Sequence, residues 1–138
     1  MKSSLILPMA TQFLYMVGVL LYMLKTRVDG VKNGQISGKY FKTYFGTPPP
    51  ERIQLVGRHY DNQFQVPMLF FATAAVTMIL GAVTPFTQTL AWIFVVSRFV
   101  HGWIHLGSNK ILRRMMAFAT GWIVLLIWWI NLTISSLQ

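Results

Sequence analysis

The sequence predicts an all-α integral membrane protein, a single domain of residues 1–138 built as a bundle of four transmembrane helices. Hydrophobic residues make up 54% of the 138-residue chain and charged residues only 11%, too few charges for the surface of a soluble domain. Four apolar runs each approach the roughly 20 residues that a helix needs to cross a hydrocarbon core. None alternates apolar with polar residues, so helices are expected rather than the strands of a barrel. The expected spans cover residues 3–24, 50–82, 86–106 and 111–134.

The first span, residues 3–24, is followed by the basic residues "KTR" and has no small-residue cleavage site. These features favour a retained helix over a removed signal peptide. The long connection that follows contains "KYFKTYF", whose aromatics and lysines are typical of a segment at the lipid headgroups. A lid over a binding site is the alternative interpretation.

The second helix is expected to begin at Pro50 and to run to residue 82, which is longer than a bilayer core requires. Its first half therefore either projects into the cytoplasm or lies buried inside the bundle. Pro67 removes a backbone donor and is expected to kink this helix. Pro85 opens the third helix, and "HLGSNK" supplies turn and cap residues before the fourth.

The net charge is +9, and the positions of the basic residues along the chain indicate a membrane topology. Basic residues gather in the first and third connections, whereas "GAVTPFTQT" between the second and third spans carries no charge. By the positive-inside rule both basic loops are cytoplasmic and both termini lie on the opposite side, as in a multi-pass protein of the bacterial inner membrane. Nucleic-acid binding is not expected, because most aromatics lie in the spans and not among the basic residues. The basic residues of the first and third connections are Lys25, Arg27, Lys32, Lys39, Lys42, Arg52, Lys110, Arg113 and Arg114.

Polar side chains form a stripe at the start of the second helix. Arg58, Asn62 and Gln65 are spaced by four and then three residues, which places them on one helix face. Asp61 borders the same stripe. Polar groups at membrane depth are costly unless they face protein or a water-filled cavity.

A second stripe lies on the third helix, where Arg98, His101 and His105 share one face. An arginine inside an apolar span is a functional-site hypothesis in its own right. In one interpretation Asp61 simply pairs with Arg98 across the two helices. In the other, both stripes converge near the cytoplasmic opening and bind an anionic ligand.

The chain contains no cysteine, so any sulfur chemistry needs a thiol supplied by a ligand. His101 and His105 have the i, i+4 spacing of two zinc ligands on one helix face. No glutamate follows the first of them, however, and His59 is the only further candidate ligand. No metal site is therefore predicted.

These motifs and the four spans resemble the MAPEG family, the membrane-associated proteins in eicosanoid and glutathione metabolism. The family's second helix bears arginine, asparagine four residues on and glutamate three further, shortly before a proline. Here "RHYDNQFQVP" supplies Arg58, Asn62, Gln65 and Pro67, with glutamine where the family has glutamate. The stretch "NQFQVPMLFF" is especially similar to a bacterial branch of the family.

The third helix of the family bears arginine, a polar or aromatic residue three on, and usually a tyrosine four beyond. "RFVHGWIH" supplies Arg98, His101 and His105, with a histidine in place of the tyrosine. Arg113 or Arg114 matches an arginine near the start of the family's fourth helix. The resemblance covers essentially the whole chain.

The resemblance implies a homotrimer that binds glutathione, as a co-substrate, in clefts between subunits near the cytoplasmic side. It implies that Arg58 and Asn62 hold the tripeptide. It also implies that Arg113 or Arg114 stabilises a thiolate that attacks a lipophilic electrophile. The ligand-binding candidates are Arg58, Asn62, Gln65, Arg98, His101 and His105, and the catalytic candidates are Arg113 and Arg114.

Three functions are compatible with these motifs. The first is a glutathione-dependent transferase or peroxidase of MAPEG type that acts on lipophilic electrophiles. The second is a non-catalytic homologue that binds a lipid or an anion. The third is a small transporter or channel subunit, in which the polar stripe of the second helix lines the trimer axis. The expected partners are further copies of the chain, membrane lipids and a lipophilic small molecule.

Overall fold

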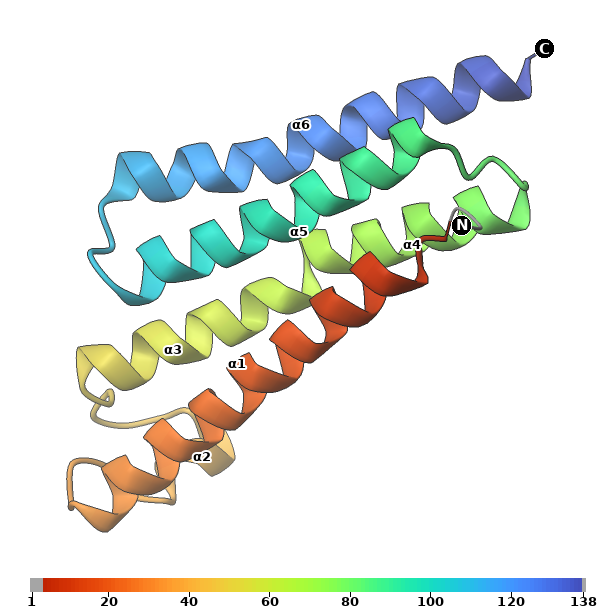
Figure 1. The fold of residues 1–138 in the computed structure, drawn as a ribbon. Helices are drawn as coiled ribbons and strands as arrows, with labels where there is room; N and C mark the ends of the chain where they lie inside the picture. Colours follow the sequence, from red (N-terminus) through yellow and green to blue (C-terminus); the bar gives the residue numbers. More distant parts are fainter. Residues whose placement is uncertain (1–3, 138) are drawn as a thin grey trace.

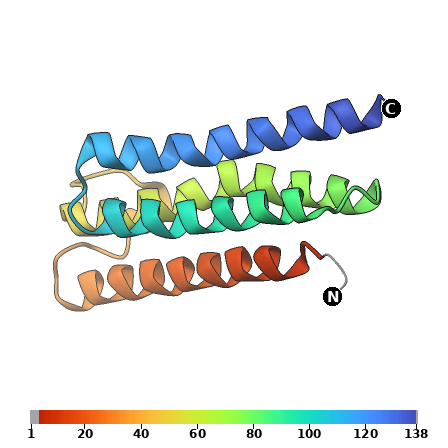
Figure 2. The same cartoon turned by 45° about the horizontal axis from the view of Figure 1, so that its top comes forward.

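The computed structural model describes residues 4–137, so Ser3, the first residue of the first predicted span, lies outside it. Within this range the fold is all-α, as predicted, and long helical segments lie side by side (Figures 1 and 2). The elements are α1 (Ile6–Lys32), α2 (Tyr40–Thr43), α3 (Glu51–Asp61), the short 3₁₀ helix η1 (Asn62–Phe64), α4 (Val66–Ile79), α5 (Pro85–Leu106) and α6 (Ile111–Ser136).

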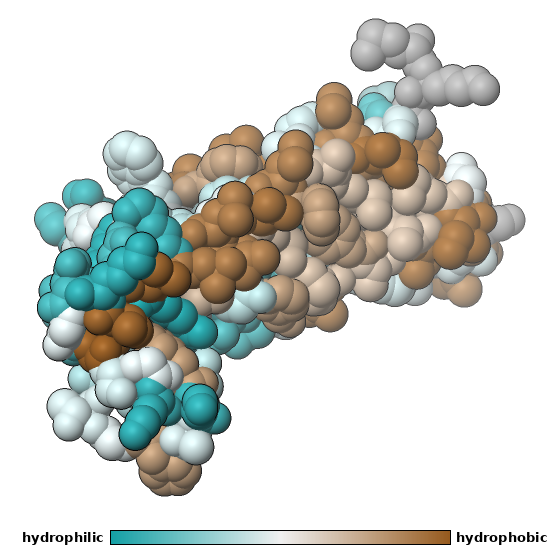
Figure 3. All heavy atoms as spheres, turned by 90° about the horizontal axis from the view of Figure 1, so that it is seen from below, coloured by the Kyte–Doolittle hydropathy of each residue, from teal (hydrophilic) through white to brown (hydrophobic). Residues whose placement is uncertain are grey.

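Three helices, α1, α5 and α6, are long and apolar enough to cross a membrane. Large apolar side chains remain exposed along them, including Phe13 on α1 and Ile123 on α6. Figure 3 shows apolar surface over much of the length of the molecule, with polar surface gathered toward one end. Exposed apolar surface on this scale is typical of contact with lipid, so the chain is an integral membrane protein. The bundle of four transmembrane helices and the homotrimer stay predictions.

The segment expected as one helix over residues 50–82 is divided in two. Helix α3 ends at Asp61, η1 follows, and the backbone leaves helical geometry at Gln65, whose φ and ψ are −106° and −103°. Pro67 then lies in the first turn of α4, where its missing N–H does no harm. The break therefore falls just before Pro67, and it falls within the polar stripe.

The connections between the long helices lie at two opposite ends of the molecule. The start of α1, the connection between α4 and α5, and the end of α6 lie together at one end (Figures 1 and 2). The connection that contains α2 and the connection between α5 and α6 lie at the other end. The two basic loops thus share one end, as the predicted topology requires. Which side of the membrane this end faces stays a prediction.

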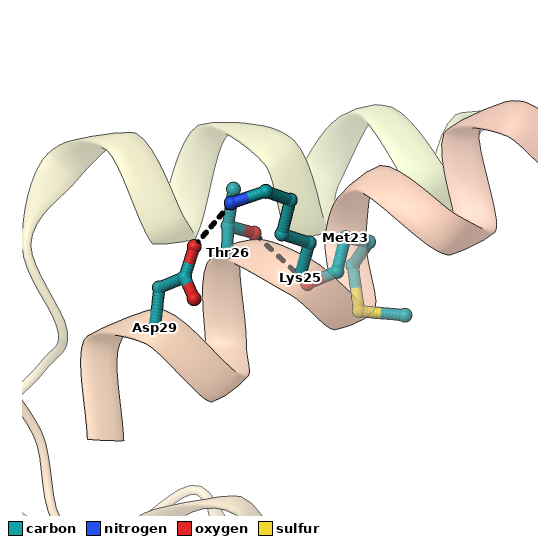
Figure 4. Close-up of polar contacts among 4 residues, drawn as sticks. All are labelled: Met23, Lys25, Thr26 and Asp29. Carbon is teal, nitrogen blue, oxygen red and sulfur yellow. Dashed lines mark hydrogen bonds and ion pairs between the residues drawn. The ribbon is translucent and has the colours of Figure 1, made fainter. Parts of the chain in front are cut away.

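The end of α1 carries the single salt bridge found among residues 4–137. Lys25 Nζ lies 2.6 Å from Asp29 Oδ2, one turn further along the helix (Figure 4). Beside it Thr26 Oγ1 donates a hydrogen bond of 2.9 Å to the carbonyl oxygen of Met23. An exposed i, i+4 pair contributes only a few tenths of a kcal/mol, so packing and hydrogen bonds, rather than ion pairs, hold the helices together.

The apolar core lies between α4, α5 and α6. The rings of Phe70 and Phe94 stack with their centroids 4.5 Å apart, and Trp128 packs edge-on against Phe70 at 6.2 Å. All three side chains are fully buried. Ring stacking of this kind adds to the stabilisation that burial alone provides. The core therefore holds α4, the second half of the divided segment, between two full-length helices.

Candidate functional site

A pocket of about 470 Å³ lies where α3, η1, α5 and α6 meet. It is near the end of the molecule that carries the two basic loops, because it includes the last turns of α5 and the first turns of α6. Both polar stripes contribute to its wall. The residues that line it are Arg58, Asp61, Asn62, Gln65, His101, His105, Arg114, Met115 and Phe118.

The local break in the second segment helps to shape this pocket. Asn62 begins η1, and Gln65 is the residue between η1 and α4. A straight helix would carry Asn62 and Gln65 along one regular stripe, whereas here the chain changes direction between them. Gln65 is exposed and Asn62 half-buried, so both amides are accessible from the pocket.

Arg98, predicted to bind the ligand, does not line the pocket. Its side chain is 4% exposed, and Nη2 donates hydrogen bonds to the carbonyl oxygens of Ala117 at 2.9 Å and Phe118 at 3.2 Å. A Cβ atom at Gly121 would lie 2.5 Å from Nη2, so this glycine makes room for the guanidinium. Arg98 therefore joins α5 to α6, and its role in ligand binding stays a prediction.

Asp61 does line the pocket, and its carboxylate is exposed. Among residues 4–137 the only salt bridge is the one near the end of α1. The proposed ion pair between Asp61 and Arg98 is therefore wrong, because the guanidinium of Arg98 is occupied by backbone carbonyls of α6. The pocket consequently holds one free carboxylate beside cationic and amide side chains.

The structure separates the two arginines at the start of α6. Arg114 lines the pocket, and its Nη1 donates a hydrogen bond of 2.8 Å to Asn109 Oδ1. Asn109 has a positive φ of 46° in the connection before α6, a conformation that asparagine tolerates better than most residues. Arg113 is exposed and outside the pocket. Of the two arginines, Arg114 alone lines this pocket.

Three histidines lie together beside the pocket. His59, on α3, is fully buried, and its ring centroid lies 5.9 Å from that of His101 and 5.2 Å from that of His105 on α5. Tyr15, on α1, forms a 2.9 Å hydrogen bond with Nε2 of His59. Gly102 leaves room for this contact, because a Cβ atom there would clash with the hydroxyl of Tyr15.

Sequence reasoning predicted none of Tyr15, Met115 and Phe118 as site residues. Met115 and Phe118 follow Arg114 by one and four residues, so helical spacing could have placed Phe118 on the same face. For Tyr15 no local signal existed, because it lies 44 residues from its partner His59. Only the packing of α1 against α3 and α5 brings it to the site.

Comparison with known protein families matches residues 5–134 of the chain to the MAPEG family. No curated protein and no solved structure matches the chain.

Proposed function

The chain belongs to the MAPEG family, and on this premise we propose that it is a glutathione-dependent transferase or peroxidase that acts on lipophilic electrophiles. Membership associates the chain broadly with glutathione or eicosanoid metabolism, and members of the family generally use glutathione. The observation that carries the proposal is the pocket. Cationic, amide and carboxylate side chains, including members of both polar stripes, line this single cavity.

The residues of the pocket suit the chemistry of glutathione. The tripeptide carries two carboxylates, one ammonium group and one thiol. Arg58 and Arg114 are cationic partners for carboxylates, and hydrogen bonds between ionised groups are the stronger kind. Asn62 and Gln65 add amide donors and acceptors. The volume of about 470 Å³ falls within the range of roughly 300–1,000 Å³ that is usual for small-molecule sites.

Asp61 can replace the carboxylate that the family's glutamate supplies and that Gln65 lacks. A glutamine there cannot form an ion pair with the ammonium group of the ligand, which the family's glutamate would do. Asp61 lines the same pocket with an exposed carboxylate and can take over that contact. We propose that the acid has moved four residues along the chain while the charge pattern of the pocket is kept.

In the proposed reaction the guanidinium of Arg114 stabilises the thiolate form of glutathione, because a neighbouring cation favours the charged form of a thiol. The thiolate sulfur attacks an electrophilic carbon, a C–S bond forms, and the leaving group departs with the electrons of the broken bond. Met115 and Phe118 provide an apolar wall against which a lipophilic substrate can pack. The membrane would supply such a substrate.

In this proposal the divided segment α3–η1–α4 crosses the membrane as well, which brings the number of spans to four. The chain forms a homotrimer, and the pocket lies between subunits. Exposed apolar side chains along α1, α5 and α6 are compatible with both lipid and subunit contacts. The pocket then opens on the cytoplasmic side of a bacterial inner membrane, at the end where the basic loops gather.

A non-catalytic lipid- or anion-binding homologue is the second candidate. His105 stands where a tyrosine is usual in the family, and it lines the pocket. Without that hydroxyl, a pocket rich in cationic side chains could bind an anionic headgroup and catalyse nothing. Saturable binding without turnover of any thiol would favour this candidate.

The test is calorimetric titration of glutathione into the detergent-solubilised protein, followed by a conjugation assay with an activated aryl halide. Arg58→Ala and Arg114→Ala should each weaken glutathione binding about tenfold or more, since a hydrogen bond to a charged group contributes about 1.5–3 kcal/mol. Arg113→Ala is the matched control, because Arg113 neighbours Arg114 but lies outside the pocket. It should bind and turn over like the parent protein.

Each outcome has a defined meaning. If the parent protein binds no glutathione, the ligand assignment is wrong. If Arg113→Ala loses activity while Arg114→Ala keeps it, the assignment of the activating arginine is wrong. Binding that Arg58→Ala and Arg114→Ala abolish, without conjugation of any electrophile, would transfer support to the non-catalytic candidate.

A further inference from the structure

The three histidines of the chain are gathered at one point. His59 comes from α3, and His101 and His105 come from successive turns of α5. Their side chains are between 0% and 5% exposed. One ring nitrogen of each can be chosen so that all three lie within 4.8 Å of one another. A chain with only three histidines thus buries all of them in a single cluster.

Ring nitrogens in this cluster lack partners. His59 Nδ1, His101 Nε2 and both nitrogens of His105 are buried and form no hydrogen bond with the described residues. A neutral imidazole presents one N–H donor and one lone pair, and leaving such groups unpaired away from water is costly. Four buried ring nitrogens, at least one from each histidine, are therefore available to bind one group together.

The opposite nitrogens of two rings do have partners. His101 Nδ1 lies 3.3 Å from the carbonyl oxygen of Arg114. Since a carbonyl only accepts, this contact requires the proton on Nδ1 and leaves the lone pair on Nε2. His59 Nε2 lies 2.9 Å from the hydroxyl of Tyr15 and 3.5 Å from the amide nitrogen of Gln63. In the tautomer in which Nε2 donates to the Tyr15 hydroxyl, the lone pair lies on Nδ1 and the longer contact with Gln63 is given up. Metal-binding histidines are usually oriented in this way by a hydrogen bond at the nitrogen that does not bind the ion.

We propose that His59, His101 and His105 bind a divalent transition-metal ion of the zinc type through three ring nitrogens. Imidazole donors suit zinc, cobalt, nickel and copper. Tetrahedral zinc, with bonds of about 2.0–2.1 Å, requires ligand nitrogens roughly 3.3 Å apart. From a separation of at most 4.8 Å, each ring needs to move by only about 1 Å.

The site has an entrance and an open coordination position. His101 and His105 belong to the wall of the pocket, so an ion can enter from there. Three protein ligands leave a fourth position for water or a small ligand, as in catalytic rather than structural zinc sites. The inference goes beyond the proposed function, since it concerns the metal alone and holds whether or not glutathione binds.

The surrounding charge restricts that fourth ligand. Arg58 and Arg114 line the adjoining pocket, and Asp61 is its only acidic side chain. A dication held by three neutral imidazoles adds to this positive charge. The fourth position therefore favours an anion, such as hydroxide, a carboxylate or a thiolate, over a neutral ligand.

The experiment uses the full chain in detergent, purified without a polyhistidine tag, stripped with a chelator and dialysed against Zn²⁺ or Co²⁺. The bound metal is measured by mass spectrometry, and visible absorption reports the geometry of bound Co²⁺. One ion per chain is expected, with a tetrahedral cobalt spectrum. His105→Phe should weaken binding by more than about tenfold, yet fold well, because it removes two buried nitrogens that have no partner. His101→Gln is a second variant with the same expected loss.

Two further variants separate a metal site from general damage. Tyr15→Phe keeps all three imidazoles but removes the hydroxyl that contacts His59, so it should retain one ion per chain with an affinity about tenfold weaker. Asp29→Asn removes a carboxylate at the end of α1, outside the pocket, and should retain one ion at a similar affinity. Size-exclusion profiles and circular dichroism verify that each variant is folded.

Protection of the histidines provides a readout without substitutions. Diethyl pyrocarbonate modifies free imidazole, so bound Zn²⁺ should slow the modification of the parent protein. The proposal is overturned if the reloaded parent protein holds no stoichiometric Zn²⁺ or Co²⁺, or if His105→Phe and His101→Gln bind the ion as the parent does. Neither result depends on glutathione, so the proposed function is tested separately.

Discussion

Arg98 places a positive charge within an apolar helix, and the structure shows what satisfies it. The guanidinium donates to two carbonyl oxygens of α6 and lies near the rings of Phe94 and Phe118, with Cζ 5.3 Å and 5.5 Å from the two centroids. Backbone carbonyls and ring faces can both stabilise a buried cation. The contact is close only because residue 121 has no side chain.

Gly121→Ala should therefore destabilise the protein by displacing Arg98. The new Cβ atom would lie 2.5 Å from Nη2 and 2.9 Å from Cζ of Arg98, so the hydrogen bonds to α6 would be lost. Such bonds to a charged group contribute about 1.5–3 kcal/mol. The free energy of unfolding, measured by denaturation in mixed detergent micelles, should fall by a similar amount.

Gly18→Ala is the control for this substitution. Gly18 lies within α1, and a Cβ atom there would meet nothing within 4 Å. Its stability should be unchanged or slightly higher, since alanine favours helix over glycine. Equal losses in the two variants would show that the contact with Arg98 is not the cause.

At the scale of helices, α4 is attached to α6 by hydrogen bonds as well as by packing. Trp128 Nε1 donates to Thr77 Oγ1 at 3.0 Å, and Trp129 Nε1 donates to Thr73 Oγ1 at 2.9 Å. The two threonine hydroxyls in turn donate to carbonyl oxygens one turn back in α4. Each hydroxyl thus connects the backbone of α4 with an indole of α6.

Thr77→Val should weaken the attachment of α4 to α6. Valine has nearly the same shape, but it leaves the buried indole N–H of Trp128 without an acceptor. Hydrogen bonds between membrane helices contribute about 0.6 kcal/mol on average and up to about 1.7 kcal/mol, and a loss within this range is expected in the same denaturation assay. Thr133→Val is the matched control, because the Thr133 hydroxyl is exposed and bonds only within α6. A loss as large in the control would contradict the assignment.

At the scale of the whole molecule, one end gathers the basic loops and the other gathers the start of α1 and the end of α6 (Figure 1). Figure 3 shows the corresponding polar surface at one end. The positive-inside rule predicts that this end faces the cytoplasm. The natural absence of cysteine makes this orientation simple to test by labelling.

Single cysteines introduced as Ser37→Cys and Ser135→Cys should react differently with a membrane-impermeant maleimide. Ser37 lies in the exposed basic connection after α1, and Ser135 is exposed near the end of α6. In spheroplasts the cysteine at 135 should be labelled, and the one at 37 only after the membrane is permeabilised. The parent protein provides an unlabelled background. Labelling of the cysteine at 37 first would reverse the predicted orientation.

The apolar runs by themselves determined that the chain is an α-helical membrane protein. Helices α5 and α6 begin and end within two residues of the predicted ranges, whereas α1 continues to Lys32, beyond the expected end at residue 24. The membrane spans themselves stay predictions. The fold class is predictable because, in lipid, each segment must satisfy its own backbone hydrogen bonds, so length and composition suffice. Helical spacing likewise determined which polar side chains share a face, as for Arg58 and Asn62 on the second segment. The break at Gln65 was predictable only as a kink near Pro67.

Only the tertiary structure decided how those faces meet. Helical spacing could not show that Arg114 enters the pocket while its neighbour Arg113 stays outside, or that Arg98 turns to the backbone of α6. It also could not bring His59 and Tyr15, from α3 and α1, to the pair of histidines on α5. These contacts depend on the rotation and depth of each helix against its neighbours, which follow from side-chain packing across the whole molecule rather than from any local pattern.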